Sequence, residues 1–387
     1  MNNFIFQYPT KVYFGKDCAK EYLACLLKEQ GPTVMLAYGG GSVKTNGVYD
    51  QMRDILAQAG KTVVEFSGIM PNPTYAKVQE GAKLCREHGV DFILAVGGGS
   101  VVDCCKIVSA QAMLDEDIWE MEFTKREYPT RFIPMGAIVT ASGTGSEMNN
   151  GAVITHEEKK LKAGVLGAYN TFAMLDPEYT MSVPFSQVMS GAFDTLSHAM
   201  ETYFGKPHDH NTLSDGISEA VMRSVIANMR LLLADHQSYE ARSELMWASA
   251  MAENGILKIG KVTDFQCHQM EHQLGAYTDC NHGQGLAVLH PALYRHIYKE
   301  GVAKFKSFAV NVWGIDPTGK TDEETARLGV ETLAAFIREV GLPTSFAQMG
   351  IPNHTDYRAI ADSCNLTAGC CKKLTHEELY QIFEECK

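Results

Sequence analysis

The chain has 387 residues, of which 45% are hydrophobic and 21% charged, as is typical of a globular protein. This length exceeds what one hydrophobic core usually serves, so we expect two domains. The formal charge of −12 argues against nucleic acid or an anionic membrane as a partner, although backbone dipoles can still hold a phosphate locally. No signal-peptide pattern opens the chain, and no apolar run approaches the ~20 residues of a membrane span. Eleven cysteines without CxxC pairs indicate reduced thiols and a cytoplasmic location.

The first part of the chain alternates strand-like runs with helical patterns. The strand-like runs cover 33–38, 62–68, 91–96 and 132–139, and helical patterns cover 48–60, 76–89 and 101–113. The run at 91–96 is apolar almost throughout, as a buried parallel strand should be. This alternation predicts a parallel sheet with helices on both faces.

After about residue 184 long helical patterns dominate, and strand-like alternation almost disappears. The helical patterns cover 186–204, 214–235, 241–257 and 324–341. We therefore expect a helical second domain that runs to the end of the chain.

Two short stretches of this helical part concentrate potential metal ligands. Asp194 and His198 lie four residues apart, as do His268 and His272, and His282 follows fourteen residues after His268. Residues four apart on a helix share one face, so each pair can point at one spot. One carboxylate with neutral imidazoles suits a divalent first-row metal such as Zn or Fe(II).

Three glycine-rich turns follow the strand-like runs, at 39–42, 97–100 and 140–147. Glycine lets a backbone approach a phosphate closely, and the start of the next helix offers oriented N–H donors. None fits GxGxxG or the Walker A motif, so neither the common dinucleotide fingerprint nor an ATPase is indicated. Asp103 lies one turn into the helix after the second loop, where it could brace the loop or accept from a ligand amide.

Taken together, the motifs of the chain resemble those of a known family. GGGSVKTNGVYD, PNP at 71–73, GGGSVVDCCK, TASGTGSE, D-x3-H and H-x3-H-x9-H before glycine resemble the iron-containing (group III) alcohol dehydrogenases, closest to their butanol dehydrogenase/aldehyde reductase branch. The resemblance implies an α/β NAD(P)-binding domain over 1–183 and an all-helical metal-binding domain over 184–387, the fold shared with dehydroquinate synthase. It also implies an active site in the cleft between them.

The resemblance carries residue roles over to this chain. Asp194, His198, His268 and His282 would bind the metal, and His272 would stand near it as a proton relay, so that His268 and His272 are the catalytic histidines. The implied cofactor-binding residues are Gly39, Gly40, Gly41, Ser42, Asn72, Gly97, Gly98, Gly99, Ser100, Asp103, Thr140, Ser142, Thr144, Lys162 and Tyr179.

The nucleotide and the metal are less determined. No carboxylate stands at the end of the first strand-like run, while Ser42 can donate a hydrogen bond and Lys44 can offer charge, so NADP(H) is favoured over NAD(H). One divalent ion is expected, Fe(II) or Zn, because the ligand set accepts both.

The expected reaction is the interconversion of short-chain primary alcohols, such as butanol, and aldehydes by hydride transfer. One alternative is a metal-dependent lyase or hydrolase of the dehydroquinate synthase type, for which Lys258 and Lys261 are the basic residues near the ligands. Another is a non-catalytic metal- or nucleotide-binding module. A homodimer is expected, through an edge strand near 11–15 unless those residues form a packed hairpin. His208 and His210 belong to a segment that we expect to be an exposed loop.

Overall fold

The computed structural model describes residues 2–207, 211–369 and 371–387, and its contacts divide the chain into two units. One unit comprises Gln7–Val183, and the other comprises Pro184–Lys387 with the first residues up to Phe6. The residues ahead of Gln7 therefore group with the helical unit, where the Asn2 N–H donates to the Gly260 carbonyl at 3.4 Å. The 208–210 segment lies outside the described residues.

The Gln7–Val183 unit is an α/β fold on a six-stranded sheet in the order β1-β8-β5-β4-β2-β3. Every pair of neighbouring strands in this sheet is parallel, so the parallel sheet predicted from the alternation is confirmed. The strands are β1 (Lys11–Phe14), β2 (Thr33–Tyr38), β3 (Thr62–Phe66), β4 (Phe92–Gly97), β5 (Met135–Val139) and β8 (Phe172–Leu175), with β6 (Gly151–His156) and β7 (Leu161–Leu166) in a separate antiparallel hairpin.

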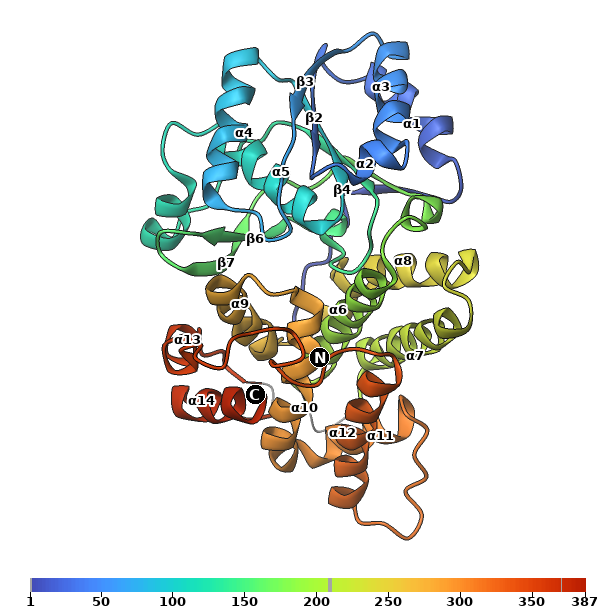
Figure 1. Cartoon of the computed structure of the whole chain (residues 1–387), viewed down its shortest axis with the longest axis vertical. Helices are drawn as coiled ribbons and strands as arrows, with labels where there is room; N and C mark the ends of the chain where they lie inside the picture. Colours follow the sequence, from blue (N-terminus) through green and yellow to red (C-terminus); the bar gives the residue numbers. More distant parts are fainter. Residues whose placement is uncertain (1, 208–210, 370) are drawn as a thin grey trace. The chain divides into compact units, whose positions relative to one another are not determined.

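Helices cover both faces of the sheet. Figure 1 shows α4 and α5 on one side of the strands and α1 and α3 on the other. The helical segments are α1 (Cys18–Lys28), α2 (Ser42–Thr45), α3 (Val48–Gln58), α4 (Tyr75–His88), α5 (Gly99–Gln111), the π-helix η1 (Glu120–Lys125) and the 3-10 helices η2 (Ser146–Met148) and η3 (Pro177–Thr180). The carboxyl ends of β5, β4 and β2 therefore lie side by side, each followed by a glycine-rich turn.

Two local features differ from the sequence-based prediction. Strand β5 begins at Met135 rather than at 132, because Pro134 has no N–H to donate to a ladder. Helix α5 begins at Gly99, so half of the second glycine loop is already helical. Residues Lys11–Phe14 form an edge strand parallel to β8, which is the first of the two arrangements expected for this segment.

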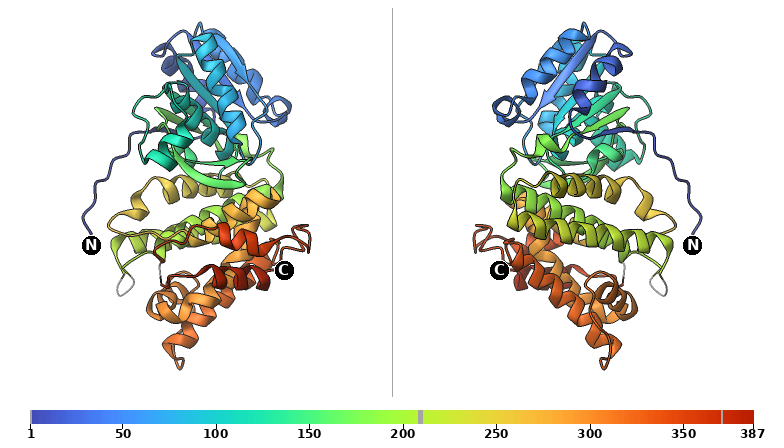
Figure 2. Two further views of the ribbon diagram at one scale, coloured as in Figure 1. Left: turned by 90° about the vertical axis from the view of Figure 1, so that its left-hand side faces the viewer. Right: turned by 90° about the vertical axis from the view of Figure 1, so that its right-hand side faces the viewer.

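The Pro184–Lys387 unit is helical. Figure 2 shows α6, α7 and α8 as long helices that pack side by side. The segments are α6 (Phe185–Tyr203), α7 (Leu213–Ala234), α8 (Tyr239–Glu253), η4 (Ile256–Lys258), α9 (Gln266–Thr278), α10 (His282–Ile297), η5 (Tyr298–Gly301), α11 (Val302–Asn311), α12 (Asp322–Glu339), α13 (Tyr357–Ser363) and α14 (His376–Glu385). Helix α8 ends four residues before the predicted end, because Gly255 adopts φ +88° and breaks the helix.

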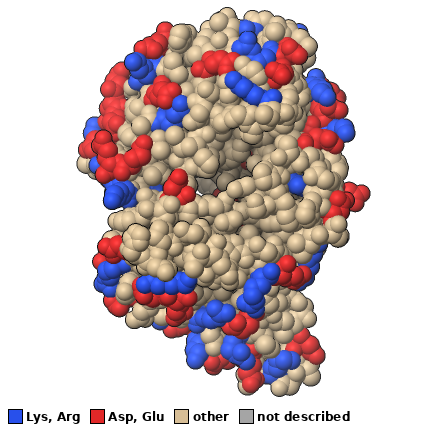
Figure 3. Space-filling view, viewed as in Figure 1, with Lys and Arg blue, Asp and Glu red and all other residues tan. Residues whose placement is uncertain are grey.

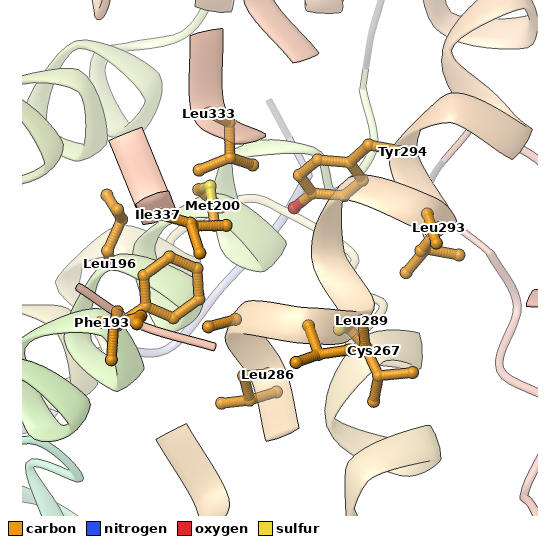
Figure 4. Packing of buried hydrophobic residues seen from close by; sticks show 14 of the residues in the cluster. Phe193, Leu196, Met200, Cys267, Leu286, Leu289, Leu293, Tyr294, Leu333 and Ile337 are labelled. Atoms are coloured by element: carbon orange, nitrogen blue, oxygen red, sulfur yellow. The ribbon is translucent and has the colours of Figure 1, made fainter. Parts of the chain in front are cut away.

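One hydrophobic core joins the helices of this unit. Figure 4 shows Phe193 and Leu196 of α6 facing Leu286 and Leu289 of α10, with Ile337 of α12 beside them. All five side chains are fully buried. The core therefore holds α6 and α10, which carry proposed metal ligands, in a fixed packing arrangement.

The surface in Figure 3 carries Lys and Arg side chains interspersed with Asp and Glu. No helix within the described ranges combines the length and apolar character that a membrane crossing requires. The ten cysteines that the structure describes are all free thiols.

Candidate functional site

Three helices bring the proposed metal ligands together. Helix α6 carries Asp194 and His198, α9 carries His268, and His282 is the first residue of α10. The Asp194 Oδ1 atom lies 3.4 Å from His282 Nε2, 3.5 Å from His268 Nε2 and 3.8 Å from His198 Nε2. The three histidines named from spacing and resemblance thus converge on one carboxylate oxygen of Asp194, the fourth residue of the set.

The spacing of these atoms suits coordination of a shared divalent ion better than direct hydrogen bonds between the side chains. Asp194 Oδ1 and His268 Nε2 are both buried, and neither has a hydrogen-bond partner among the described residues. Leaving such atoms unsatisfied is costly. Around a tetrahedral ion with bonds of 2.0 to 2.2 Å, the ligand atoms lie about 3.3 to 3.6 Å apart, close to the spacing here. One carboxylate oxygen and imidazole nitrogens are suitable donors for Zn or Fe(II).

The electrostatics of the cluster leave Asp194 and His198 in the protonation states that metal binding needs, whereas His268 has to release a proton when the ion binds. Burial opposes charge on Asp194, but the neighbouring His198 and His282 outweigh it and hold its pKa well below the usual range. Burial lowers the pKa of His198 to about 4. Burial also acts to lower the pKa of His268, but the charge of Glu201 overrides it and raises that pKa to about 10. An ionised carboxylate and a neutral imidazole are therefore already present at neutral pH, as metal binding needs.

Two glutamates that the sequence reading missed complete the cluster. Glu201 accepts a hydrogen bond from His268 Nδ1, and Glu271 accepts one from His282 Nδ1. Both carboxylates are buried. Their spacing offered a signal: Glu201 lies seven residues, or two helical turns, after Asp194, and Glu271 lies three after His268.

The close approach of α6 and α10 explains the residues around His282. A side chain at Gly283 would place its Cβ 2.1 Å from the backbone oxygen of Ser190, so only glycine fits there. Asn281 caps α10 by accepting from the Gln284 N–H at 3.0 Å, and it also accepts from Ser190 Oγ at 2.5 Å. The first turn of α10 is thereby fixed against α6, with His282 toward Asp194.

His272 lies beside the cluster. Its ring centroid is 5.7 Å from that of His282 and 6.1 Å from that of His268. Its side chain is buried, and a nitrogen of its ring lies within 4.8 Å of ligand atoms of Glu271 and His282. A position next to a proposed ligand suits a residue that exchanges protons with the substrate.

Phe265 borders the same cluster. It precedes α9 in a left-handed conformation, φ +59°, which is unusual for a residue other than glycine. Its ring centroid lies 5.1 Å from that of His268 and 6.0 Å from that of His198. Met270, by contrast, is fully buried in the core. Phe265 therefore places an aromatic ring beside two of the proposed ligands.

Glu201 also lines a small cavity. The cavity measures about 10 Å³, room for about one water molecule, so it does not accommodate a substrate. Its lining residues are Glu201, Phe204, Asp264, Leu293, Tyr294 and Ile297.

The glycine turns at the sheet edge pack tightly. A Cβ at Gly99 would lie 2.1 Å from Thr144 Oγ1, and one at Gly97 would lie 2.5 Å from the side chain of Val101. Gly98, the N-cap of α5, lies close to Ala141. The 97–100 and 140–147 loops thus form one compact surface of backbone groups beside the start of α5, which suits a pyrophosphate.

Asp103 and Ser100 connect these loops to their neighbours. The Asp103 carboxylate accepts from the Ser146 hydroxyl and from the Val153 N–H at 2.9 Å, so it braces the third glycine loop and strand β6. The Ser100 hydroxyl donates to the carbonyl of Pro71. The 71–73 turn, and with it Asn72, is thereby held next to the 97–100 loop.

The remaining predicted cofactor residues are spread over this unit. Thr140 is buried at the end of β5, whereas Gly40 and Gly41 of the first loop have open space around them. Lys162 is buried on β7. Tyr179 belongs to the hydrophobic core on the α1 and α3 side of the sheet, and burial raises the pKa of its hydroxyl. Its predicted contact with the nicotinamide stays a prediction.

The end of β2 contains a charge network that the sequence reading missed. Lys44 Nζ lies 4.7 Å from the ring centroid of Tyr49 and 5.1 Å from that of Tyr38. Both tyrosine hydroxyls donate to the Glu65 carboxylate on the neighbouring strand β3, at 2.5 and 2.7 Å. A carboxylate therefore lies near this strand end, although none follows β2 in the sequence.

Comparisons with known proteins agree with this arrangement. Residues 9–177 match the family model for iron-containing alcohol dehydrogenases, and residues 188–386 match the model for the C-terminal part of that family. The chain is 38% identical over 392 residues to NADH-dependent butanol dehydrogenase A of Clostridium acetobutylicum, with 100% of both proteins covered. It is 37% identical over 358 residues to NADPH-dependent aldehyde reductase YqhD of Escherichia coli, covering 91% of this chain and 90% of that protein. The crystal structure of NADH-dependent butanol dehydrogenase A from Thermotoga maritima superposes with a TM-score of 0.93 at 34% identity, covering 100% of this chain and 99% of that one.

Proposed function

Since the chain belongs to the iron-containing alcohol dehydrogenase family, we propose that it interconverts primary alcohols and aldehydes with a nicotinamide nucleotide and one divalent metal ion. The observation that carries this proposal is the convergence of His198, His268 and His282 on Asp194 Oδ1, a buried atom that lacks a hydrogen-bond partner among the described residues. The glycine loops of the α/β unit supply the matching nucleotide surface.

When bound, the metal supplies a Lewis acid at the substrate oxygen, and the nicotinamide donates or accepts the hydride. Asp194 and the three histidines would hold the ion. His272 moves a proton between the substrate oxygen and solvent, a role that suits its place beside His282. Phe265 shields the reacting groups from water through its contacts with His198 and His268.

The nucleotide preference proposed here is NADP(H). Ser42 and Lys44 follow β2 with open space around Gly40 and Gly41, which leaves room for a 2′-phosphate. Glu65 works against this preference, because a nearby carboxylate repels the 2′-phosphate. The same balance leaves NAD(H) as a substrate of lower affinity. Fe(II) and Zn both suit the donor set.

The proposed substrates are short-chain primary alcohols such as butanol, and their aldehydes. We further propose a cytoplasmic homodimer. Strand β1 lies at the sheet edge and exposes Phe14, and an exposed edge strand is a natural surface for pairing with a second copy.

No observation favours a lyase that acts on a phosphorylated substrate. Such an enzyme would need available cations near the metal ligands. Lys258 Nζ instead forms an ion pair with Glu253 at 2.8 Å, and Lys261 is buried against Asp215.

The proposal is tested by following the absorbance of NADPH and NADH with butanal, on chelator-stripped protein before and after Fe(II) or Zn is added. Metal-dependent loss of NADPH, faster than loss of NADH, is expected. No loss of either nucleotide with any metal, across a panel of aldehydes and ketones, would reject the proposed function.

A further inference from the structure

Two of the proposed metal-binding histidines are each hydrogen-bonded to a buried glutamate. We propose that Glu201 and Glu271 are positioning residues that hold His268 and His282 with Nε2 turned toward Asp194, so that the ion meets preset ligands. A hydrogen bond from Nδ1 fixes both the tautomer and the orientation of an imidazole. This inference rests on the proposed function, because it needs a metal at the cluster.

The Glu201 carboxylate is held rigidly in turn. It accepts from the Cys267 N–H at 2.7 Å and from the His268 N–H at 3.3 Å, so it ties the first turn of α9 to α6. Helix α6 also carries Asp194, two turns before Glu201. One helix therefore supplies both a ligand and the group that orients the facing ligand.

Glu271 orients the other histidine, His282, from helix α9. It lies on α9 and reaches His282 on α10, and the Cys280 thiol also approaches its Oε1 at 3.9 Å. The approach requires a glycine on α10, because a Cβ at Gly285 would lie 2.9 Å from Glu271 Cγ. Gly285 thus makes room for the carboxylate that orients His282.

His198 is the proposed histidine ligand whose Nδ1 is not hydrogen-bonded to a glutamate. Its buried Nδ1 has no hydrogen-bond partner among the described residues, and its ring is held by stacking on His268, with centroids 4.6 Å apart. It is also the ligand whose Nε2 lies farthest from Asp194 Oδ1. The two histidines bound to glutamates are therefore expected to contribute most to metal affinity.

A purely structural role for the two glutamates is the competing explanation, and Glu219 provides the matched control. It is buried in the same unit, where it accepts from Tyr203 at 2.9 Å and from Asn311 at 2.8 Å. These contacts involve no proposed metal ligand. Replacing Glu219 by Gln therefore perturbs a buried carboxylate without touching the metal cluster.

The test uses the full chain, stripped of metal and titrated with Zn or Co(II) in competition with a coloured chelator. Glu201→Gln and Glu271→Gln are expected to weaken binding by about 10- to 100-fold. They should also change the visible spectrum of bound Co(II), which reports ligand geometry. Glu219→Gln should bind as tightly as the unmodified protein, even if its melting temperature falls.

Unchanged affinity and spectrum in both Gln variants would overturn the inference, as would an equal loss in Glu219→Gln. If a Gln variant does not fold, Gly285→Ala tests the same point, since it keeps every ligand and both carboxylates but displaces Glu271. Weaker binding supports the inference, and unchanged binding overturns it. An unmodified protein that binds neither metal would instead count against the proposed function.

Discussion

Replacing Gly283 by alanine should weaken metal binding, even though alanine is the better helix former. The new Cβ would lie 2.1 Å from the backbone oxygen of Ser190. Backbone cannot rotate away as a side chain can, so α6 and α10 must separate by about 1 Å to restore an ordinary contact. His282 precedes Gly283, so this movement takes its imidazole away from Asp194.

The size of the effect follows from two opposing contributions. Helix propensity favours alanine by about 1 kcal/mol. Overpacking of a tight contact costs about 1 to 3 kcal/mol. The net loss of stability is therefore small, about 0 to 2 kcal/mol. A catalytic group displaced by about 1 Å can cost about 100-fold in turnover, so function should suffer more than folding.

The assay compares Gly283→Ala with Gly216→Ala, in metal affinity by chelator competition and in the midpoint of denaturant unfolding. Gly216 lies in α7, where an added Cβ would have no neighbouring atom within 4 Å, so its replacement should raise stability slightly and leave metal affinity unchanged. If Gly283→Ala behaves like Gly216→Ala in both measurements, the close contact does not position His282 and the reasoning is refuted.

Three further predictions concern other parts of the chain. His272→Ala should keep metal and nucleotide but slow turnover by about 10²- to 10⁴-fold, and loss of metal in that variant would show that His272 is a ligand instead. Gly99→Ala, whose Cβ would meet Thr144, should weaken NADPH binding by about 1 to 3 kcal/mol in a fluorescence titration while metal affinity stays unchanged; unaltered NADPH binding would contradict the loop assignment. Glu122 is buried, and although its carboxylate accepts the Leu166 N–H, burial raises its pKa to about 7. Between about pH 4.5 and 7 the folded state then binds more protons than the unfolded state, so the free energy of unfolding should fall as pH rises through this window. The fall should be smaller in Glu122→Gln, and an equal pH dependence in the two proteins would reject this prediction.

Much of the fold follows from local sequence patterns. The apolar run at 91–96 and the glycine turns that follow strands predict parallel strands whose following loops lie at the same edge of the sheet. Strands β4 and β2 are parallel neighbours, as this pattern predicts. The spacing of Asp194 and His198 predicts a shared helical face, which α6 provides. Such patterns repeat over adjacent turns or strands, so they are visible in the sequence alone.

Other features depend on contacts between distant residues. Glu65 lies at the end of β2 only because β3 pairs beside it, and Glu271 reaches His282 only because α9 packs on α10. The sequence does not distinguish Gly283 and Gly285 from other residues that follow His282. The need for glycine arises because α6 packs against Gly283 and α9 packs against Gly285. The β6–β7 hairpin escaped prediction because its strands, GAVITH and LKAGVL, lack the nearly continuous apolar runs of the central strands β2 and β4.

The central claim is that one divalent ion sits among Asp194, His198, His268 and His282 and serves alcohol and aldehyde chemistry. Anomalous diffraction from crystals grown with Zn or Fe(II) and nucleotide tests it most directly. We expect a single strong peak within bonding distance of Asp194 Oδ1 and of the Nε2 atoms of His198, His268 and His282. A peak elsewhere in the chain, or a fully folded and active protein without a peak at this cluster, would contradict it.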